Sequence, residues 1–258
     1  MLRSTTPIES IGRKSSPLWN QLFPKVIALI SRERKARAPR PRVPHGMAYW
    51  WAGWIPGETL QDCLLYHPRS VIPSLQTSRL LLRPLELADA KQTQLLFPHW
   101  EIVRYLAKSV PWPYPPDGAY TYYRDVALPA MARGDQWHWT LRLKTEPQQL
   151  IGCIALLKGE KINRGFWLGL PWHGQGLMTE ACEAVTDYWF NTLKFPVLRA
   201  PKAVANVASC RISEKSGMRL VAREEHEYVS GRLPTEIWEI TAEEWNARRT
   251  RHAGSRGR

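Results

Sequence analysis

The strand, glycine turn and helix predicted between Ile162 and about Leu193 constrain the fold of this chain more than any other segment. A short run of apolar and aromatic residues is followed by two closely spaced glycines, Gly174 and Gly176, and then by an amphipathic stretch that begins at Leu177. Apolar residues in that stretch recur at three- and four-residue spacing, which is typical of a helix with one buried face. Such a helix requires a neighbouring layer, so the segment predicts a sheet covered by helices.

The glycine turn itself predicts a site for a phosphate group. Gly174 and Gly176 can adopt positive φ and let a ligand approach the backbone closely. The helix that follows presents unbonded N–H groups and a partial positive charge at its start. The turn is not a Walker A loop, since no Gly-Lys-Ser/Thr ends it, and Thr179 stands where a dinucleotide fingerprint needs glycine. A turn that merely joins strand to helix is the alternative.

The remaining hydrophobic patterns predict an α+β, or mixed α/β, domain with a mostly antiparallel sheet. The expected elements, in chain order, are a strand at Arg79–Leu85, helices at Leu87–Phe97, Glu101–Ala107 and Asp117–Met131, strands at Gln136–Leu143, Leu150–Leu157 and Ile162–Leu170, the helix after the glycine turn, a strand at Val197–Val204, a helix from Asn206 to Gly217, and strands at Met218–Tyr228 and Leu233–Ile240.

Charge divides the chain into three parts. The net charge of +13 comes from residues 1–46 (+8) and 247–258 (+5), so residues 47–246 are neutral. We therefore predict a basic, largely disordered N-terminal extension at 1–75, one domain at 76–246 and a basic C-terminal tail at 247–258. A native start at Met47 or later is an alternative for the first part. Nucleic acid is expected to make only weak contacts, through the basic ends.

Several classes of protein are excluded by what the sequence lacks. No apolar run approaches the roughly 20 residues that span a bilayer, and the N-terminus has no signal peptide pattern, so we expect a cytoplasmic protein without a membrane partner. The four cysteines are scattered and form no CxxC pair, which argues against a disulfide framework and a zinc site. His99, His138 and His173 are not spaced as metal ligands, so no metal is expected.

Four motifs in a fixed order carry a resemblance to a known family. They are Thr77–Pro84, Val110–Tyr114, the turn with Thr179-Glu180-Ala181 after it, and Asn206-x-x-Ser209 followed by Glu214-Lys215-x-Gly217-Met218. Residues 76–245 thereby resemble the GNAT superfamily of N-acetyltransferases, and within it the ribosomal-protein alanine/serine N-acetyltransferase-like (RimJ/RimL-like) group. The resemblance implies a GNAT-like central, mostly antiparallel twisted sheet of about seven strands flanked by helices, and acetyl-CoA as co-substrate.

The resemblance also implies roles for individual residues. The backbone of Trp167, Leu168 and Gly169 would orient the pantetheine arm, Asn206 would bond CoA, and Ser209 would protonate the leaving thiolate. The pyrophosphate would lie on His173, Gly174, Gln175, Gly176, Leu177, Met178 and Thr179. Asn206 as a plain helix cap and Ser209 as an ordinary hydroxyl remain alternatives. Two positions depart from the family pattern: Pro171 replaces a frequent Gln or Arg, and the usual tyrosine is absent near Ser213.

The sequence constrains the amine that accepts the acetyl group less than it constrains the acetyl donor. Trp112, Tyr114 and Trp172 are candidates to line its pocket, and no general base stands out, since Asn163 and Arg164 occupy the strand where a carboxylate would help. An α-amine with pKa near ~8 needs about 3 kcal/mol less help to lose its proton than lysine at about 10.4. We therefore expect a protein N-terminal α-amine or a small-molecule amine, an antibiotic or polyamine included. The competing interpretation is a non-catalytic CoA- or RNA-associated GNAT-like binding protein; either would be a monomer or homodimer.

Overall fold

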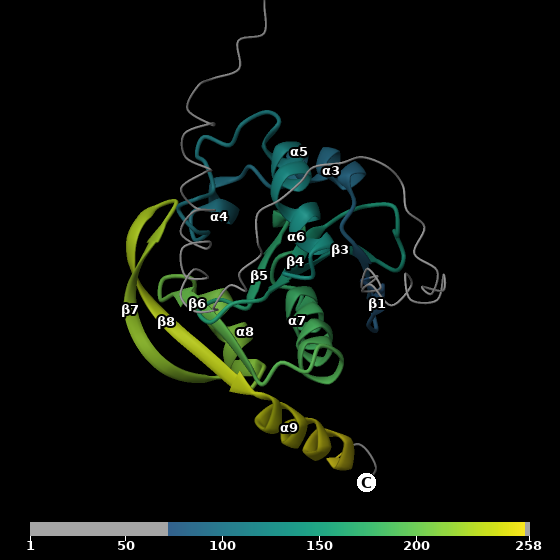
Figure 1. Ribbon diagram of the computed structural model, residues 1–258, viewed down its shortest axis with the longest axis vertical. Coiled ribbons are helices and arrows are strands. Elements are labelled where there is room, and N and C mark those ends of the chain that lie inside the picture. The colour runs from purple at the N-terminus through teal and green to yellow at the C-terminus, as the bar shows by residue number, and fades with distance from the viewer. Residues whose placement is uncertain (1–71, 256–258) are drawn as a thin grey trace, which may run out of the picture. The chain divides into compact units, whose positions relative to one another are not determined.

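The computed structural model describes residues 72–255 (Figure 1). The extension predicted at 1–75 therefore lies outside the described residues except for its last four. Of those four, Ile72 is buried in the main core and the Pro73 carbonyl accepts a hydrogen bond from Trp139 Nε1 at 2.8 Å. Residues before the predicted boundary at 76 thus contact the core of the domain.

Within residues 72–255, eight strands form two antiparallel sheets. The first sheet has the order β1-β2-β3-β4-β5 and the second has the order β6-β8-β7. The strands are β1 (Leu75–Gln76), β2 (Leu80–Pro84), β3 (Gln136–Leu143), β4 (Gly152–Leu157), β5 (Arg164–Leu168), β6 (Val197–Ala203), β7 (Arg219–Tyr228) and β8 (Gly231–Thr241). The α+β class and the mostly antiparallel sheet are confirmed, and the predicted count of about seven strands omitted the two-residue β1.

The two sheets meet along β5 and β6. Asn163 N–H donates to the Arg199 carbonyl at 2.8 Å, and Arg199 N–H donates to Asn163 Oδ1 at 2.7 Å. Three residues further along each strand, Phe166 and Lys202 are still neighbours, so the strands run in the same direction. Within residues 72–255 the backbone bonding between them stops at Asn163 and Arg199. Beyond that point each strand keeps one edge free.

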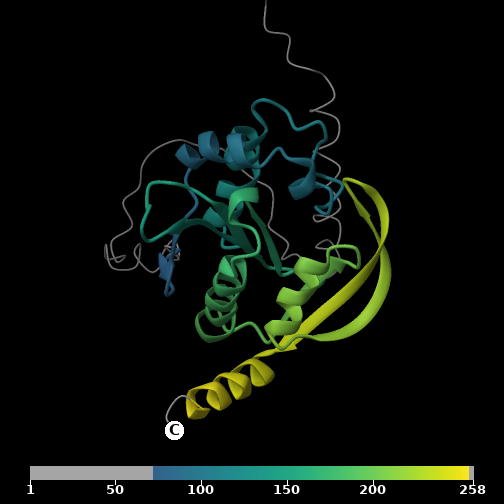
Figure 2. The same ribbon diagram turned by 180° about the vertical axis from the view of Figure 1, so that it is seen from behind.

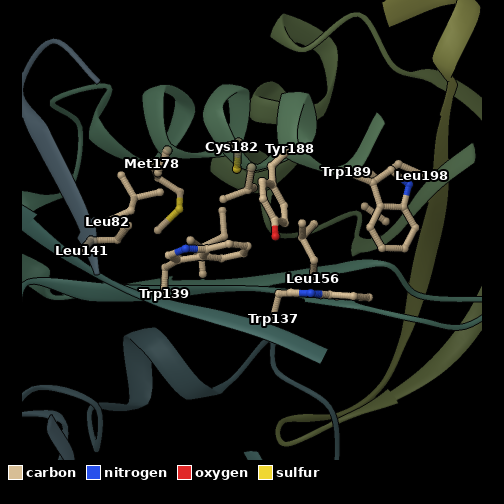
Figure 3. Packing of buried hydrophobic residues seen from close by; sticks show 14 of the residues in the cluster. Leu82, Trp137, Trp139, Leu141, Leu156, Met178, Cys182, Tyr188, Trp189 and Leu198 are labelled. Carbon is tan, nitrogen blue, oxygen red and sulfur yellow. The ribbon is translucent and has the colours of Figure 1, made fainter. Parts of the chain in front are cut away.

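Helices cover both faces of the first sheet. Figures 1 and 2 show α3 (Ala90–Leu96), α5 (Gly118–Tyr122) and α6 (Leu128–Ala132) on one side and α7 (Leu177–Asp187) on the other. Alternation along β3 sends Trp137, Trp139 and Leu141 towards α7 (Figure 3). The residues between and after them, His138, Thr140 and Arg142, point towards the opposite helices and are also buried. The sheet is therefore buried on both faces.

The predicted helices are confirmed, with differences at their ends. Leu87–Asp89 forms a 3-10 turn that leads into α3, and α4 (Trp100–Val103) ends four residues before the predicted Ala107. A π-helical turn at Tyr123–Ala127 joins α5 to α6, which allows Pro129, a residue without an N–H, to lie inside the helical segment. Asp117 precedes α5, but its side chain accepts a bond from Thr121 Oγ1 and caps no backbone N–H.

The C-terminal boundary also differs from the prediction. Helix α9 (Ala242–Ser255) crosses the expected start of a basic tail at 247. Trp245 anchors this polar helix, since it is only 2% exposed and belongs to the main core. Arg248 Nη2 also bonds Glu183 on α7 at 2.9 Å. None of the helices within residues 72–255 is long and apolar enough to cross a bilayer.

Candidate active site

The connection between β5 and α7 has the conformation that its glycines predict. Gly174 has φ +74° and Gly176 has φ +77°, and α7 begins directly after Gly176. A Cβ atom on Gly174 would meet nothing within 4 Å, so the backbone there faces open space. Residues 173–176 are exposed, which leaves the turn accessible to a ligand.

The start of α7 presents unbonded donors. The first intrahelical bond runs from Glu180 N–H to the Gly176 carbonyl, and no side chain caps the helix. In the described part of the chain, the backbone N–H groups of Leu177, Met178 and Thr179 therefore have no partner. Their direction and the helix dipole favour an anion at this position.

Two side chains hold the turn against the first sheet. Arg79 Nη1 donates to the Gln175 carbonyl at 3.0 Å, and Arg79 Nε lies 2.7 Å from Glu180 Oε2. Glu180 also accepts bonds from Thr77 Oγ1, from Ser78 Oγ at 3.0 Å and from Arg79 N–H at 2.8 Å. Burial raises the pKa of Glu180, but these bonds outweigh it and bring the pKa down to about 2. Sequence reasoning placed these residues in motifs without foreseeing the clamp that they form.

The edge of β5 that faces away from β4 is free of strand pairing in the part of the strand next to the glycine turn. Gly169 N–H bonds the Ile151 carbonyl and Leu157 N–H bonds the Asn163 carbonyl, so these residues face β4. Because strand residues alternate, the backbone groups of Phe166 and Leu168 face the opposite edge. The Leu168 carbonyl there accepts a bond from His173 Nε2 at 2.8 Å. His173, predicted to touch the pyrophosphate, thus uses one ring nitrogen to brace the strand end.

Helix α8 (Val207–Lys215) begins at the end of β6 as predicted. Asn206 Oδ1 accepts a bond from Ser209 N–H at 3.2 Å, so Asn206 acts as the helix cap that the sequence allowed as an alternative. Its amide nitrogen makes no bond to another described residue and can serve a ligand. Ser209 is buried, and Gly217 ends the helix with φ +75° as predicted.

Two buried cations lie between the sheets and α7/α8, and sequence reasoning missed their role. Arg164 is 2% exposed and Lys202 is 8% exposed. Arg164 bonds Thr186 Oγ1 at 2.8 Å and Met218 Sδ at 3.4 Å, while Lys202 Nζ lies 4.3 Å from the centroid of the Phe166 ring. The sequence did contain a signal for this burial: Lys202 alternates with the apolar residues Leu198 and Ala200, so it lies on the same buried face of the strand.

The three predicted acceptor-side aromatics lie in different surroundings. Tyr114 packs edge-on against Phe97, at 4.9 Å between ring centroids, and Phe97 is 5.3 Å from Trp167. Trp112 is 42% exposed and pairs with Trp100 at 5.5 Å. Trp172 instead covers Gly169, where a Cβ atom would lie 2.7 Å from the Trp172 ring. The described clusters therefore bring Tyr114 and Trp167 together but not the three predicted residues.

The tip of the β7–β8 hairpin closes one side of this aromatic cluster. Val229 N–H donates to the Leu106 carbonyl at 3.0 Å, and Lys108 N–H donates to the Glu227 carbonyl at 3.3 Å. Ser230 Oγ adds a bond to the Arg104 carbonyl at 2.7 Å. The loop after α4 and the hairpin tip thus form one bonded unit, although more than 100 residues separate them in sequence.

The described residues offer no alternative centre for metal or disulfide chemistry. Within residues 72–255, no group of three or more His, Cys, Asp or Glu side chains is placed to hold a metal ion. Cys153, Cys182 and Cys210 are free and buried, and Cys63 lies outside the described residues.

Comparisons with known proteins agree with the geometry. A sequence profile described as the Acetyltransferase (GNAT) domain matches residues 79–219. An uncharacterised N-acetyltransferase of Bacillus subtilis (strain 168), YnaD, is 28% identical over 149 residues, which is 56% of this chain and 82% of that protein.

Solved structures share the fold. A ribosomal-protein-S5-alanine acetyltransferase from Vibrio fischeri superposes with a TM-score of 0.58 at 14% identity, covering 67% of this chain and 98% of that chain. A spermidine N-acetyltransferase from Vibrio cholerae, in complex with CoA and spermine, superposes with a TM-score of 0.55 at 18% identity, covering 65% and 98%. Their names specify different amines, so this fold alone does not determine the acceptor.

Proposed function

Because this chain belongs to the GNAT family of acetyltransferases, we propose that it transfers the acetyl group of acetyl-CoA to a primary amine. Acetyl-CoA supplies the activated acetyl group as co-substrate. A protein N-terminal α-amine and a small-molecule amine are the acceptor classes that we retain. The cytoplasmic location and the monomeric or homodimeric state stay predictions.

The geometry of the glycine turn carries this proposal. Residues 174–179 combine open space above Gly174, two positive-φ glycines and three free N–H groups at the start of α7. Phosphate oxygens fit this set of donors better than a neutral ligand, because the helix dipole favours negative charge. Pro171 provides no side-chain donor, so the backbone does the binding in this chain.

The arm of CoA would then follow the free edge of β5. Phe166 and Leu168 direct backbone groups to this edge, and Trp167-Leu168-Gly169 leads to it from the turn. Asn206 follows the end of β6 as the cap of α8, and Ser209 lies in the first turn of that helix. We assign Asn206 to binding the arm and Ser209 to a hydrogen bond at the reacting end.

The acceptor would approach from the opposite face of β5. Trp167 lies there with Phe97 and Tyr114, and burial raises the pKa of Tyr114 well above its ordinary value, with Tyr122 and Asp117 adding to the shift. Tyr114 therefore stays neutral at physiological pH and serves as a hydrogen-bonding wall. A site without a placed carboxylate base favours an amine of low pKa over a lysine side chain.

A panel of amines tests this function. The purified full chain is mixed with acetyl-CoA and peptides with free α-amines, acetylated peptides that carry only lysine, and polyamines, and CoA release and product mass are followed. We expect acetylated product with an α-amine or a small amine. Products labelled on lysine side chains alone contradict the acceptor class.

The same panel separates the enzyme from a binding protein. Acetyl-CoA binding without turnover on any amine would support the non-catalytic alternative. A Gly174→Val variant should bind CoA at least about tenfold more weakly, because a β-branched residue is strained at φ +74°. The matched control is Gly134→Val, since Gly134 has φ +70° and lies in the turn before β3; this variant should keep its affinity for CoA.

A further inference from the structure

Lys202 occupies a buried position at the opening between β5 and β6. Its side chain lies on the same face of β6 as Leu198 and Ala200, both of which are fully buried against α7. Its Nζ atom lies 4.3 Å from the centroid of the Phe166 ring on β5. Phe166 directs its backbone to the free edge along which we place the CoA arm, so the ammonium group borders the same space.

The groups around Lys202 do not neutralise it. Arg164 faces it from β5, Cys182 from α7 and Cys210 from α8. Glu236 on β8 is its register partner, but Glu236 Oε1 bonds Arg223 at 3.1 Å. No ion pair or hydrogen bond joins Lys202 Nζ to any other residue within 72–255.

A second donor on Arg164 and one donor on α8 also lack partners within the described residues. Arg164 Nε and Ser213 Oγ are buried and make no hydrogen bond to the described residues. Buried cations are costly to leave without a counter-charge. The cluster would therefore hold an anion that arrives with a ligand more strongly than an exposed lysine would.

When the carbon–sulfur bond breaks in the proposed reaction, the sulfur of the departing CoA carries negative charge. Resting on that function, we propose that Lys202 is the acid that protonates this sulfur. The acceptor nitrogen forms a bond to the acetyl carbon, the carbon–sulfur bond breaks, and its electron pair goes to sulfur. Lys202 gives sulfur a proton and becomes a neutral amine, which then takes the proton that the acceptor nitrogen must lose.

The acidity of Lys202 suits both proton transfers, the one to sulfur and the later one from the acceptor nitrogen. Burial, with Arg164 as the second cause, lowers the pKa of Lys202 to about 8. That value lies close to the pKa of about 8.5 of an ordinary thiol, so neither direction of transfer is strongly uphill. A serine hydroxyl is a far weaker acid, which leaves Ser209 as a hydrogen-bond donor. Lys202 thus takes the role of proton donor that the family resemblance gave to Ser209.

Three variants of the full chain test the assignment. Lys202→Met removes the charge at similar volume, Lys202→Arg keeps a charge that cannot be given up, and Lys144→Met removes an exposed lysine as control. We expect the single-turnover rate of Lys202→Met and Lys202→Arg to fall by about 100-fold or more. Lys144→Met should match the wild-type protein.

A second measurement does not depend on turnover. The thiol of bound CoA is titrated through its thiolate ultraviolet absorbance, and desulfo-CoA affinity is measured beside it. We expect the thiol pKa to be lowered in the wild-type and Lys202→Arg complexes and to return to the value of free CoA in Lys202→Met, with desulfo-CoA affinity unchanged. An unaltered thiol pKa and a rate within threefold of wild type in Lys202→Met would overturn the proposal.

Two other outcomes have separate meanings. If the wild-type protein neither binds CoA nor turns over any amine, the proposed function fails and the thiol titration has no complex to measure. If the wild-type protein prefers succinyl-CoA to acetyl-CoA and Lys202→Met loses that preference, the cations hold an acyl carboxylate. That outcome also overturns the role of Lys202 as the acid.

Discussion

The strands of the two sheets bury cations in opposite ways on their two faces. On the face towards α3 and α5, Arg142 Nη2 lies 2.5 Å from Asp89 Oδ1, and Arg142 Nη1 bonds the Gln148 carbonyl at 2.8 Å. On the face towards α7 and α8, Arg164 bonds only a hydroxyl and a thioether, and Lys202 bonds none of the described residues. The paired cation is neutralised within the protein, whereas the unpaired ones are left to the ligand in our proposal.

The pair with Asp89 should give the largest effect on stability. Asp89→Ala leaves Arg142 buried without its carboxylate and should lower the free energy of unfolding by about 3–5 kcal/mol. Urea unfolding followed by circular dichroism measures the change. The double variant Asp89→Ala with Arg142→Met should recover most of the loss, and a loss below about 1 kcal/mol in the single variant would remove the contrast between the faces.

Replacing Lys202 should change stability in the opposite direction, so that the variant is more stable than the wild-type protein. The pKa of Lys202 is about 8 in the folded chain, below the ordinary 10.5. Between these two pH values the unfolded chain binds more protons than the folded chain, so the stability of the wild-type protein rises with pH there. Lys202→Met should therefore raise the free energy of unfolding by about 2–3 kcal/mol at pH 7 and by little near pH 10.5. Urea titrations of the wild-type protein and Lys202→Met at both pH values measure this difference. A variant that is less stable than the wild-type protein at pH 7 contradicts the assignment of Lys202 as an unpaired buried cation.

Glu180 should give a smaller, mixed effect on stability and ligand binding. Glu180→Gln weakens the clamp on Arg79 and should lower the free energy of unfolding by about 1–2 kcal/mol at pH 7. Because the folded pKa is about 2, this contribution is present above the ordinary value of 4.5 and is lost as pH falls towards 2. CoA affinity measured by calorimetry should drop by about fivefold, since Arg79 also holds the turn. Glu183→Gln, one turn later on α7, should leave CoA affinity unchanged.

An exposed ion pair should give the smallest effect of all. Lys108 Nζ lies 3.0 Å from Glu227 Oε2, with 70% and 47% of the two side chains exposed. Lys108→Met should change the free energy of unfolding by less than about 0.5 kcal/mol in the same urea assay, because solvent screens such pairs. A loss as large as that of Asp89→Ala would show that exposure does not separate the two kinds of cation.

Much of this architecture could be predicted because the patterns that encode it are local. Apolar spacing after Leu177, the cap at Asn206 and the glycine at Gly217 each act within a few residues, and the structure has all three. Helix α9 was missed because a single residue, Trp245, anchors an otherwise polar segment. One apolar residue among charged neighbours forms no periodic pattern.

The site could be predicted only in part, for the same reason. The glycines and the Asn206 cap can be recognised from the local sequence. The clamp cannot, because it joins Arg79 to Glu180, which is 101 residues away. The acceptor-side aromatics were chosen by residue type, which does not specify that Trp172 covers Gly169 while Tyr114 packs on Phe97. Lys202 was visible as a polar interruption of an apolar alternation, yet its lack of a partner is a property of three-dimensional packing.

The clamp at Glu180 also has a consequence for the order of events. Thr77, Ser78 and Arg79 bond a carboxylate that is made about 100 residues later during synthesis, so the clamp on the turn forms only after residues 77–79 have met the start of α7. Linkage makes the relation reciprocal: whatever binds the turn must also tighten the hold on residues 77–79. Hydrogen exchange at the Arg79 amide, more than 90 residues before the turn, would then report whether the turn is occupied.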